Sequence, residues 1–403
     1  MARQHSDRRP TWQRRALLAA TVVAGLTVAA VGAATLSVAS AYHGIHRVSI
    51  VHAPAARPPS GPTPTPAGAT QPGLSAPINI LLTGSDGRSC IDPASPYAGA
   101  FLGHGTGAGA GDRSDTIMIL RVDPVRHQLA VLSLPRDLYV PIAGTGGRSR
   151  INAAFTPGDP NRLIQTIEAD FGIRIDHYAG VDFCAFKSLV DAVGGLSIPF
   201  AHPARDTNTG LDVAAPGCHP MAGDEALAYV RSRHYSYNVG GRWVTDTSSD
   251  FGRIARQQDF LRRLAAKALA SGATNPITAA RLLDVARSSD VRIDDGLGLA
   301  TLIGIGRAIQ AIGPANAVTY RIDGRGVVVR GADVILPDLT SPAARSVLAY
   351  FAGTGEEPAA GPPDPSPAEP TPSAAAAGPS SPGTPPRPAP ADPAVPDPAV
   401  SCR

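Results

Sequence analysis

Apolar and polar positions divide this chain into one long apolar segment and a region of alternating strand and helix signals. Residues 16–42 contain no charged side chain and are dominated by Leu, Val and Ala. That run exceeds the roughly 20 residues that cross a bilayer as a helix. Because five arginines lie within residues 1–15, the positive-inside rule places that basic N-terminus in the cytoplasm. We therefore predict a single-pass membrane anchor over 16–42, with the rest of the chain extracytoplasmic.

A cleavable signal peptide is the alternative interpretation of the same segment. Residues 39–41 (ASA) resemble a cleavage site. However, the apolar run is long for the core of a signal peptide, which favours an uncleaved signal-anchor.

Short apolar runs bounded by turn residues predict strands in the remaining sequence. These runs are 78–82, 117–122, 128–134, 196–200 and 317–322. Asp123-Pro124 separates the second run from the third, which predicts a hairpin or an adjacent strand pair. The Gly-rich stretch 89–111 reads as a long loop. A phosphate-binding loop would need a strand before the glycines and a helix directly after them.

Apolar residues at helical spacing alternate with these strands. They predict helices over 161–171, 183–193, 223–231, 254–269, 277–288 and 297–312. For the first, we expect Asn161 to be the N-cap and Gly172 to end the helix. Strands interleaved with helices indicate an α/β domain, with a mixed central sheet and helices on both faces.

Two segments have compositions that oppose folding. Residues 43–77 are rich in Pro and read as a semi-extended linker. Residues 354–403 are dominated by Pro, Ala, Ser and Gly, so they cannot bury enough apolar surface to offset chain entropy. We expect this tail to be disordered, which leaves one folded domain over 78–353.

Net charge and cysteine content exclude few classes of protein. The net charge of +3 gives no reason to expect a nucleic-acid partner, and we predict none. Only two of the 36 basic residues are lysines, an excess of arginine that GC-rich coding explains, so only clustered arginines are informative. An exported domain can form disulfides. Cys184 with Cys218 is the expected pair, with Cys402 alone in the tail, although spacing does not fix the partners.

Aspartates and arginines recur at the ends of predicted strands. Asp86 follows the first strand, Asp115 precedes the second, and Arg136-Asp137 closes the third. Each acid by itself is more often a turn or cap residue. Two acids at matching strand ends, each with an arginine two positions away, favour a shared site. Carboxylates suit a hard cation such as Mg²⁺, and guanidinium groups grip phosphate oxygens in pairs.

The ends of two predicted helices carry further candidates. Arg231 and Arg233 follow the helix 223–231, while Arg253 and Gln257 are four residues apart and so share one helix face. A solvated surface is the common alternative for such residues. If they share a cavity, a polyanion must balance them, because unpaired buried charges are very costly. Signatures of P-loop, zinc-protease and serine-hydrolase sites are absent from the sequence.

Taken in order, these motifs resemble the LytR–CpsA–Psr (LCP) family of bacterial cell-wall enzymes over residues 78–351. The matching blocks are LTGSDGR (82–88), RSDT (113–116), LSLPRD (132–137), INAAF (151–155), VDAVGG (190–195), GDEALAYVRSR (223–233) and DFGRIARQ (250–257). The arginine-rich composition and the Pro/Ala tail are similar to an actinobacterial-type member.

The resemblance implies a phosphotransferase that moves a cell-wall glycopolymer from a polyprenyl-pyrophosphate carrier to peptidoglycan, usually to the 6-hydroxyl of N-acetylmuramic acid. Arabinogalactan or a teichoic-acid-like polymer would be the cargo, and an apolar tunnel would hold the lipid. The alternatives are a polyprenyl-pyrophosphate pyrophosphatase, which uses water as the acceptor, and a non-catalytic wall-lipid receptor.

The resemblance also assigns roles to residues. It implies Mg²⁺ (or Mn²⁺) at Asp86 and Asp115, with Arg136 and Arg113 acting in catalysis and Asp137 a candidate for the general base. The implied pyrophosphate ligands are Arg113, Arg136, Arg150, Arg231, Arg233, Arg253 and Gln257. The Gly-rich loop between Arg88 and Arg113, which contains Cys90, departs from the family pattern, so its conformation near the metal is open.

Overall fold

The computed structural model describes residues 42–53, 74–87, 90, 92–98, 114–248, 250–274, 276–358 and 402. The predicted cytoplasmic segment 1–15 and the predicted anchor 16–42, except Tyr42, lie outside these residues. So does most of the predicted tail. Among the helices within the described ranges, none is both long and apolar enough to span a bilayer.

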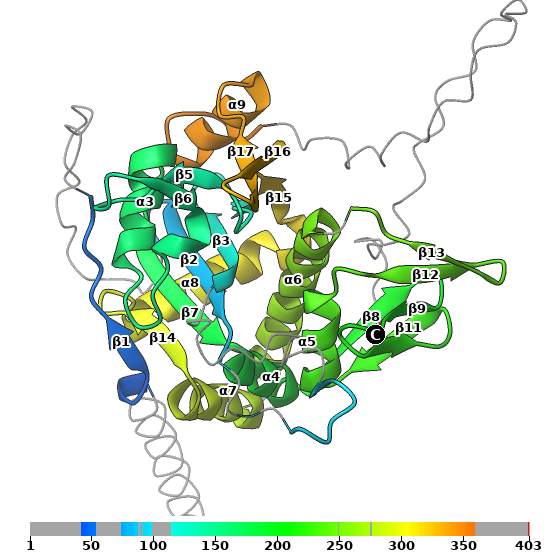
Figure 1. Ribbon diagram of the computed structural model, residues 1–403. Helices are drawn as coiled ribbons and strands as arrows, with labels where there is room; N and C mark the ends of the chain where they lie inside the picture. The colour runs from blue at the N-terminus through cyan, green and yellow to red at the C-terminus, as the bar shows by residue number, and fades with distance from the viewer. Residues whose placement is uncertain are drawn as a thin grey trace, which may run out of the picture.

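A mixed seven-stranded sheet forms the centre of the fold (Figure 1), as the strand and helix pattern predicts. Its strands, in spatial order, are β1 (His46–Val48), β14 (Val291–Asp294), β7 (His177–Asp182), β2 (Ile78–Ser85), β3 (Ser114–Asp123), β4 (Gln128–Ser133) and β15 (Val318–Arg321). Strand β2 pairs parallel with β7 and antiparallel with β3, and β3 pairs antiparallel with β4. The ends of β2 and β4 therefore lie at the same edge as the start of β3.

Helices cover both faces of this sheet. They are α3 (Asn161–Phe171), α4 (Phe183–Ala192), α5 (Gly223–Arg231), α6 (Asp250–Thr274), α7 (Pro276–Ser288), α8 (Leu299–Ile312) and α9 (Pro342–Phe351), with 3-10 turns η1 (Ile151–Ala154) and η2 (Pro314–Asn316). Successive strand residues point to opposite faces. Leu81 accordingly packs with apolar residues of α3 and α9, whereas Ile80 packs with Ile305 of α8 and Ala185 of α4.

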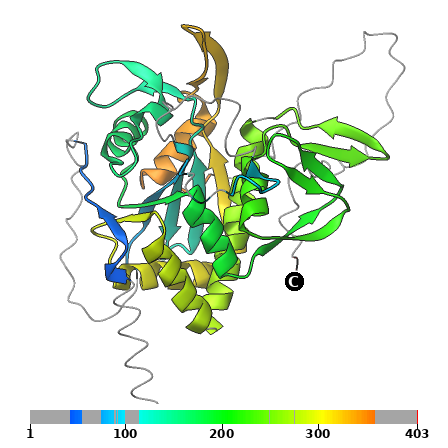
Figure 2. The ribbon, with the colours of Figure 1, turned by 60° about the horizontal axis from the view of Figure 1, so that its bottom comes forward.

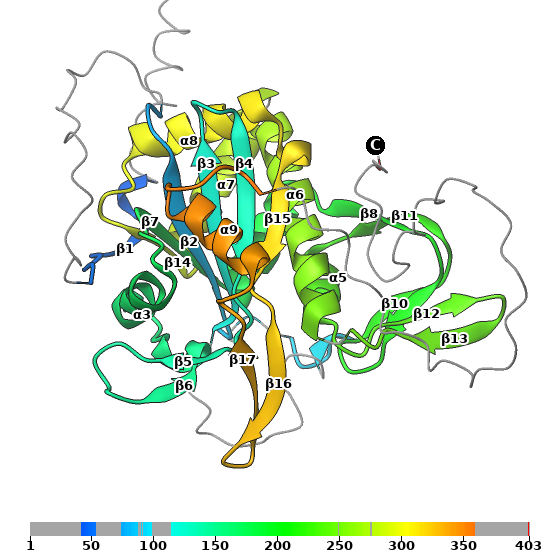
Figure 3. The same ribbon diagram turned by 90° about the horizontal axis from the view of Figure 1, so that it is seen from above.

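A second, smaller layer lies beside the central sheet, with α5 and α6 between them (Figure 2). It contains β8 (Leu196–Phe200), β9 (Ala204–Asp206), β10 (Leu211–Val213), β11 (Gly217–Met221), β12 (Ser236–Val239) and β13 (Arg242–Thr245). Strand β8, which the sequence predicts, belongs to this layer because it pairs with β11. Two hairpins, β5 (Tyr139–Pro141) with β6 (Arg148–Arg150) and β16 (Gly324–Val329) with β17 (Ala332–Pro337), stand side by side (Figure 3).

The interpretation of 43–77 as a linker is wrong at its N-terminal end. Strand β1 pairs in parallel with β14, and Val51 N donates to Asn161 Oδ1 at 2.6 Å. The Asn161 side chain also donates to Ser49 O at 3.0 Å. The prediction that Asn161 is the N-cap is wrong, because Pro160 occupies that position. The Asn161 side chain instead binds the incoming segment. Gly172 ends the helix in the left-handed region, as expected.

The predicted Cys184–Cys218 disulfide is also wrong. Cys184, at the start of α4, bonds to Cys90, and Cys218, in β11, bonds to Cys402. The two predicted partners belong to different layers of the fold. Cys402 is therefore not alone, because its bridge ties the end of the chain to the smaller layer.

Candidate functional site

The two predicted metal ligands lie at one edge of the central sheet. Ser85 is opposite Ser114 and Gly84 is opposite Thr116, so the pairing shifts between them and Asp115 is the extra residue of a bulge. Asp86 follows directly at the end of β2, and its Oδ1 atom is shielded from solvent. Only the backbone of Asp115 is described. The pairing therefore places the backbones of Asp86 and Asp115 at the same edge of the sheet.

The loop that follows Asp86 is packed against the start of α4. A Cβ atom at Gly87 would lie 2.2 Å from Asp182 Oδ2, so only glycine fits there without a shift. Asp182 is the N-cap of α4, since its Oδ1 accepts a hydrogen bond from Ala185 N at 2.7 Å. Burial raises the pKa of the Asp182 carboxyl, and this capping bond opposes the rise.

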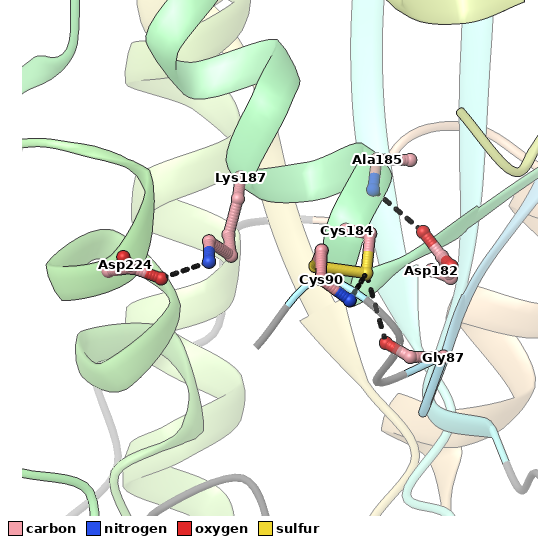
Figure 4. Close-up of a disulfide and its surroundings, with 7 residues drawn as sticks. All are labelled: Gly87, Cys90, Asp182, Cys184, Ala185, Lys187 and Asp224. Atoms are coloured by element: carbon pink, nitrogen blue, oxygen red, sulfur yellow. Dashed lines mark hydrogen bonds and ion pairs between the residues drawn. A yellow bond between two sulfur atoms is a disulfide. The ribbon is translucent and has the colours of Figure 1, made fainter. Parts of the chain in front are cut away.

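The Cys90–Cys184 disulfide holds the same loop (Figure 4). Cys184 Sγ lies 3.6 Å from the carbonyl oxygen of Gly87, and Cys90 N donates to Cys184 Sγ at 3.2 Å. The segment after β2 is therefore attached to α4 by a covalent bond as well as by close packing. This arrangement fixes the backbone beside Asp86.

Three of the predicted phosphate ligands line one small pocket. Arg136 comes from the segment after β4, while Arg253 and Gln257 come from the first turns of α6, and Thr116 of β3 completes the wall. The pocket encloses about 10 Å³, roughly the room of one water molecule. The structure thus brings together side chains that are more than 100 positions apart in the sequence.

Asp137 lies between two of the predicted arginines. Its Oδ2 is 3.4 Å from Arg136 Nε and its Oδ1 is 3.3 Å from Arg150 Nε. All three side chains are partly exposed. Arg150 is further fixed because its Nη2 donates to the carbonyl oxygen of Asp333 at 2.7 Å. The carboxylate is therefore placed to orient two guanidinium groups.

Asp250 joins two other predicted arginines in the same way. Arg233 Nε lies 3.0 Å from its Oδ1, and Arg253 Nη2 lies 2.9 Å from its Oδ2. Arg253 is only 2% exposed, whereas Arg233 is about one-third exposed. Asp250 is the first residue of the DFGRIARQ motif, but the motif did not predict a role for it. Its position three residues before Arg253, one helical turn away, was the available signal.

The turn that carries Arg233 is held by groups that the sequence did not single out. Asp206 Oδ2 accepts hydrogen bonds from Ser232 Oγ, Arg233 N and His234 N at 2.6, 3.0 and 2.9 Å. Arg256 is fully buried and donates to Ser232 O at 2.8 Å. Both residues fix the backbone of the turn.

Arg231 and Arg233 point in different directions. The Arg231 guanidinium stacks over the ring of Phe183, with 4.3 Å between Cζ and the ring centroid. Phe183 is the first residue of α4, next to the Asp182 that contacts Gly87. Gln257 Nε2 donates to Val230 O at 3.1 Å, which ties α6 to the end of α5. Arg231 therefore approaches the aspartate side of the edge, whereas Arg233 approaches the α6 side.

The remaining predicted site residue, Arg113, lies outside the described residues. Within the described ranges, no group of three or more His, Cys, Asp or Glu side chains could hold a metal ion. Mg²⁺ does not require such a group, because it keeps several water ligands and commonly binds through one or two carboxylates plus substrate phosphates. Asp86, which has a shielded carboxylate oxygen, and Asp115, whose backbone lies in the bulge at the same edge, are residue types that fit that requirement.

Comparisons with known proteins agree on one family. Residues 64–344 match the family model described as the LytR_cpsA_psr family. The chain is 40% identical to probable cell wall biosynthesis protein LcpB of Corynebacterium glutamicum over 210 residues, 52% of this chain and 45% of the relative. It is 32% identical to polyisoprenyl-teichoic acid–peptidoglycan teichoic acid transferase TagV of Bacillus subtilis over 216 residues, 51% and 52% of the two chains. The chain thus spans about half the length of these curated relatives.

Solved structures share the fold. A LytR-Csp2A-Psr enzyme from Actinomyces oris superposes with a TM-score of 0.52 at 22% identity, covering 76% of this chain and 96% of that one. Likeness at this level of identity concerns the arrangement of helices and strands.

Proposed function

Because this chain belongs to the LytR_cpsA_psr family, we propose that it transfers a cell-wall glycopolymer from a polyprenyl-pyrophosphate carrier to peptidoglycan. The similarity to TagV supports the reaction type, since the name of that relative specifies a polyisoprenyl-linked donor and a peptidoglycan acceptor. The similarity to LcpB supports a role in cell-wall biosynthesis. Arabinogalactan or a teichoic-acid-like polymer is the cargo in this proposal.

One observation of the structure carries the proposal: several guanidinium groups from separate segments gather around a single sheet edge. Five arginines approach it from four segments of the chain, and three carboxylates (Asp86, Asp137 and Asp250) lie among them. The arginines are Arg136, Arg150, Arg231, Arg233 and Arg253. A guanidinium group has several N–H donors, so an arginine that is paired with a carboxylate can also bind a phosphate oxygen. A pyrophosphate diester supplies such oxygens, and planar guanidinium groups match them.

In the proposed reaction, the arginines hold and orient the two phosphates. The acceptor hydroxyl oxygen forms a bond to the polymer-side phosphorus as the bridging P–O bond breaks, and polyprenyl phosphate leaves. Arg136, Arg253 and Gln257 face the same pocket, so they are placed to stabilise the charge that develops on the phosphate oxygens. Mg²⁺ or Mn²⁺, held by Asp86 and Asp115, would neutralise part of that charge when bound.

Asp137 has a positioning role in this proposal. Its two oxygens each face a guanidinium group at 3.3–3.4 Å, which aligns Arg136 and Arg150. That geometry differs from a general base, which must reach the acceptor hydroxyl instead. In this proposal the hydroxyl proton passes to a group other than Asp137.

The proposal extends to the membrane. Anchorage by residues 16–42, with the domain on the extracytoplasmic side, would bring the site to the lipid-linked donor. An apolar tunnel for the polyprenyl chain is part of the same proposal, because the lipid must leave water while its pyrophosphate reaches the arginines.

Product analysis tests the function. The full chain would be incubated with a polyprenyl-pyrophosphate-linked glycan and soluble peptidoglycan strands, and the muropeptides would be examined by mass spectrometry. We expect a phosphoglycan–muropeptide adduct that is lost in Arg136→Ala. Free phosphorylated glycan as the sole product would instead indicate a pyrophosphatase. Binding of the donor without turnover would indicate a receptor.

A further inference from the structure

A second, larger depression is lined by residues of the hairpins β5–β6 and β16–β17 and of the segment around η1. The two hairpins stand side by side in Figure 3. This groove has a volume of about 610 Å³. Its walls include Tyr139, Arg148 and Arg150 on one side and Arg330 on the other, with Phe155 from the segment after η1. Among the described residues that line it, three are arginines and none is acidic. The groove is therefore suited to an anionic ligand.

The groove is attached to the proposed reaction site by short contacts. Ile335 N of β17 donates to Asp137 O at 2.9 Å, and Arg150 Nε and Nη2 donate to Asp333 O at 3.1 and 2.7 Å. Arg150 also pairs with the Asp137 carboxylate. Strand β17 is thereby held against the residues that adjoin Arg136, so a ligand in the groove would end next to the pyrophosphate.

Aromatic and basic groups occur together in this groove. Arg148 donates to Tyr139 O at 2.8 Å, and its guanidinium lies 5.5 Å from the centroid of the Tyr139 ring. Arg148 is exposed, so the outer edge of its guanidinium faces solvent. Flat aromatic surfaces that adjoin guanidinium groups can contact a sugar ring and an anionic substituent at once. The combination fits a carbohydrate chain that bears carboxylates or phosphates.

The conformation of Arg330 is an independent indication that this residue is placed for binding. It forms the two-residue turn of the β16–β17 hairpin with Gly331, and their φ angles are 51° and 75°. Such turns favour Asn-Gly or Gly-Gly, because the Cβ atom of most residues makes positive φ unfavourable. Backbone strain of this kind concentrates at functional sites. An exposed arginine held there is difficult to explain by packing.

We propose that this groove binds the acceptor: a peptidoglycan strand whose stem-peptide carboxylates contact Arg148 and Arg330. The identity of the acceptor rests on the proposed function, whereas the anionic character of the ligand rests on the groove alone. A strand bound there would extend past Arg150 and present a sugar hydroxyl beside Arg136. The other anionic glycan of the reaction, the phosphate-bearing polymer, is the competing occupant that the experiment must separate.

Isothermal titration of the full chain with soluble peptidoglycan strands tests the proposal without donor or turnover. We expect Arg148→Ala/Arg330→Ala to weaken binding at least tenfold, and amidation of the stem-peptide carboxylates to weaken binding to the wild type similarly. The matched control removes two arginines from α7, Arg281→Ala/Arg287→Ala, and should bind as the wild type does. Equal affinity of the groove variant and the wild type, or groove-dependent binding of lipid-free phosphoglycan alone, would overturn the assignment.

A second variant separates binding from folding. Arg330→Gly relieves the positive φ, so it should melt no lower than the wild type and yet bind peptidoglycan strands more weakly. Unchanged binding by this variant would assign Arg330 to the turn only. Together with the product analysis, these titrations distinguish the two proposals. If the protein binds strands but forms no adduct, the transferase proposal is refuted. If the groove substitutions leave adduct formation unchanged, the acceptor-site proposal is refuted.

Discussion

Arg253 and Asp250 form an ion pair of 2.9 Å within the first turn of α6, and Arg253 is almost completely buried. The second oxygen of Asp250 meets Arg233 from the neighbouring turn at 3.0 Å. One carboxylate therefore fixes two guanidinium groups that arise from different segments. Asp137 does the same for Arg136 and Arg150. Two acids, Asp137 and Asp250, thus organise four of the proposed phosphate ligands.

Substitution of Arg253 should impair transfer strongly. Arg253→Ala removes a buried guanidinium from the pocket, and loss of one well-placed donor to a developing anion costs about 100-fold in rate. Arg253→Lys should recover little, because an ammonium cannot bridge Asp250 and a phosphate with a planar fork. The measurement is kcat/KM for glycan transfer. Arg262→Ala, on the same helix and paired with Asp259 at 2.7 Å, is the control and should retain wild-type activity.

Substitution of Asp137 separates a positioning role from proton transfer. Asp137→Asn keeps the shape but weakens both ion pairs, so we expect kcat/KM to fall by about tenfold with an unchanged pH profile. A general base would be worth about 100- to 10,000-fold. A loss of that size, together with disappearance of one limb of the pH–rate profile, would show that Asp137 accepts the proton.

The fit of Gly87 against Asp182 predicts a change in metal dependence. In Gly87→Ala the new methyl group would lie 2.2 Å from a carboxylate oxygen, so the loop beside Asp86 must move. We expect the Mg²⁺ concentration for half-maximal transfer to rise about tenfold or more. Gly147→Ala, whose methyl group meets its nearest neighbour at 3.9 Å, is the control. An unchanged Mg²⁺ requirement in Gly87→Ala would argue against Asp86 as a ligand.

A buried pair within the sheet predicts how stability depends on pH. Burial raises the pKa of Asp294, but hydrogen bonds from His177 and from Tyr178 N outweigh this effect, and the net pKa lies below 3.8. A depressed carboxyl pKa contributes stability above the unfolded value, and this contribution is lost as the pH falls through the folded value. Asp294→Asn should therefore be less stable than the wild type by about 2 kcal/mol at pH 7.

Urea unfolding at several pH values measures this effect. The difference between the wild type and Asp294→Asn should narrow as the pH falls below 3.8. A difference that stays constant down to pH 3 would mean that the charge of Asp294 contributes nothing to folding.

Elements with a clear apolar period could be predicted from the sequence. The helix 161–171 and the strands on either side of Asp123-Pro124 formed as expected. The apolar pattern does not predict strand β7, although it lies inside the sheet between β14 and β2. Its sequence, HYAGVD, is short and mixed in polarity, and burial alternates along it. Only its neighbours β2 and β14 identify it as a central strand.

The sequence predicted which residues belong to the candidate site, but not which of them contact one another. Arg136, Arg253 and Gln257 were singled out from motifs, and the fold brings them into one pocket. The bridging position of Asp250 depends on the turn that carries Arg233, which Asp206 and Arg256 fix from distant parts of the chain. The disulfide partners could not be predicted for the same reason, since Cys90 and Cys184 are 94 residues apart and the pairing of β2 with β7 brings their segments together.

Titration of the full chain with a short-chain polyprenyl pyrophosphate, and with the corresponding monophosphate, measures whether the arginines converge on a pyrophosphate. In the presence of Mg²⁺, the wild type should bind the pyrophosphate more tightly than the monophosphate, and Arg136→Ala/Arg253→Ala should lose that preference with a drop in affinity of about 100-fold. Retention of wild-type affinity and preference by the double variant would contradict the proposed site.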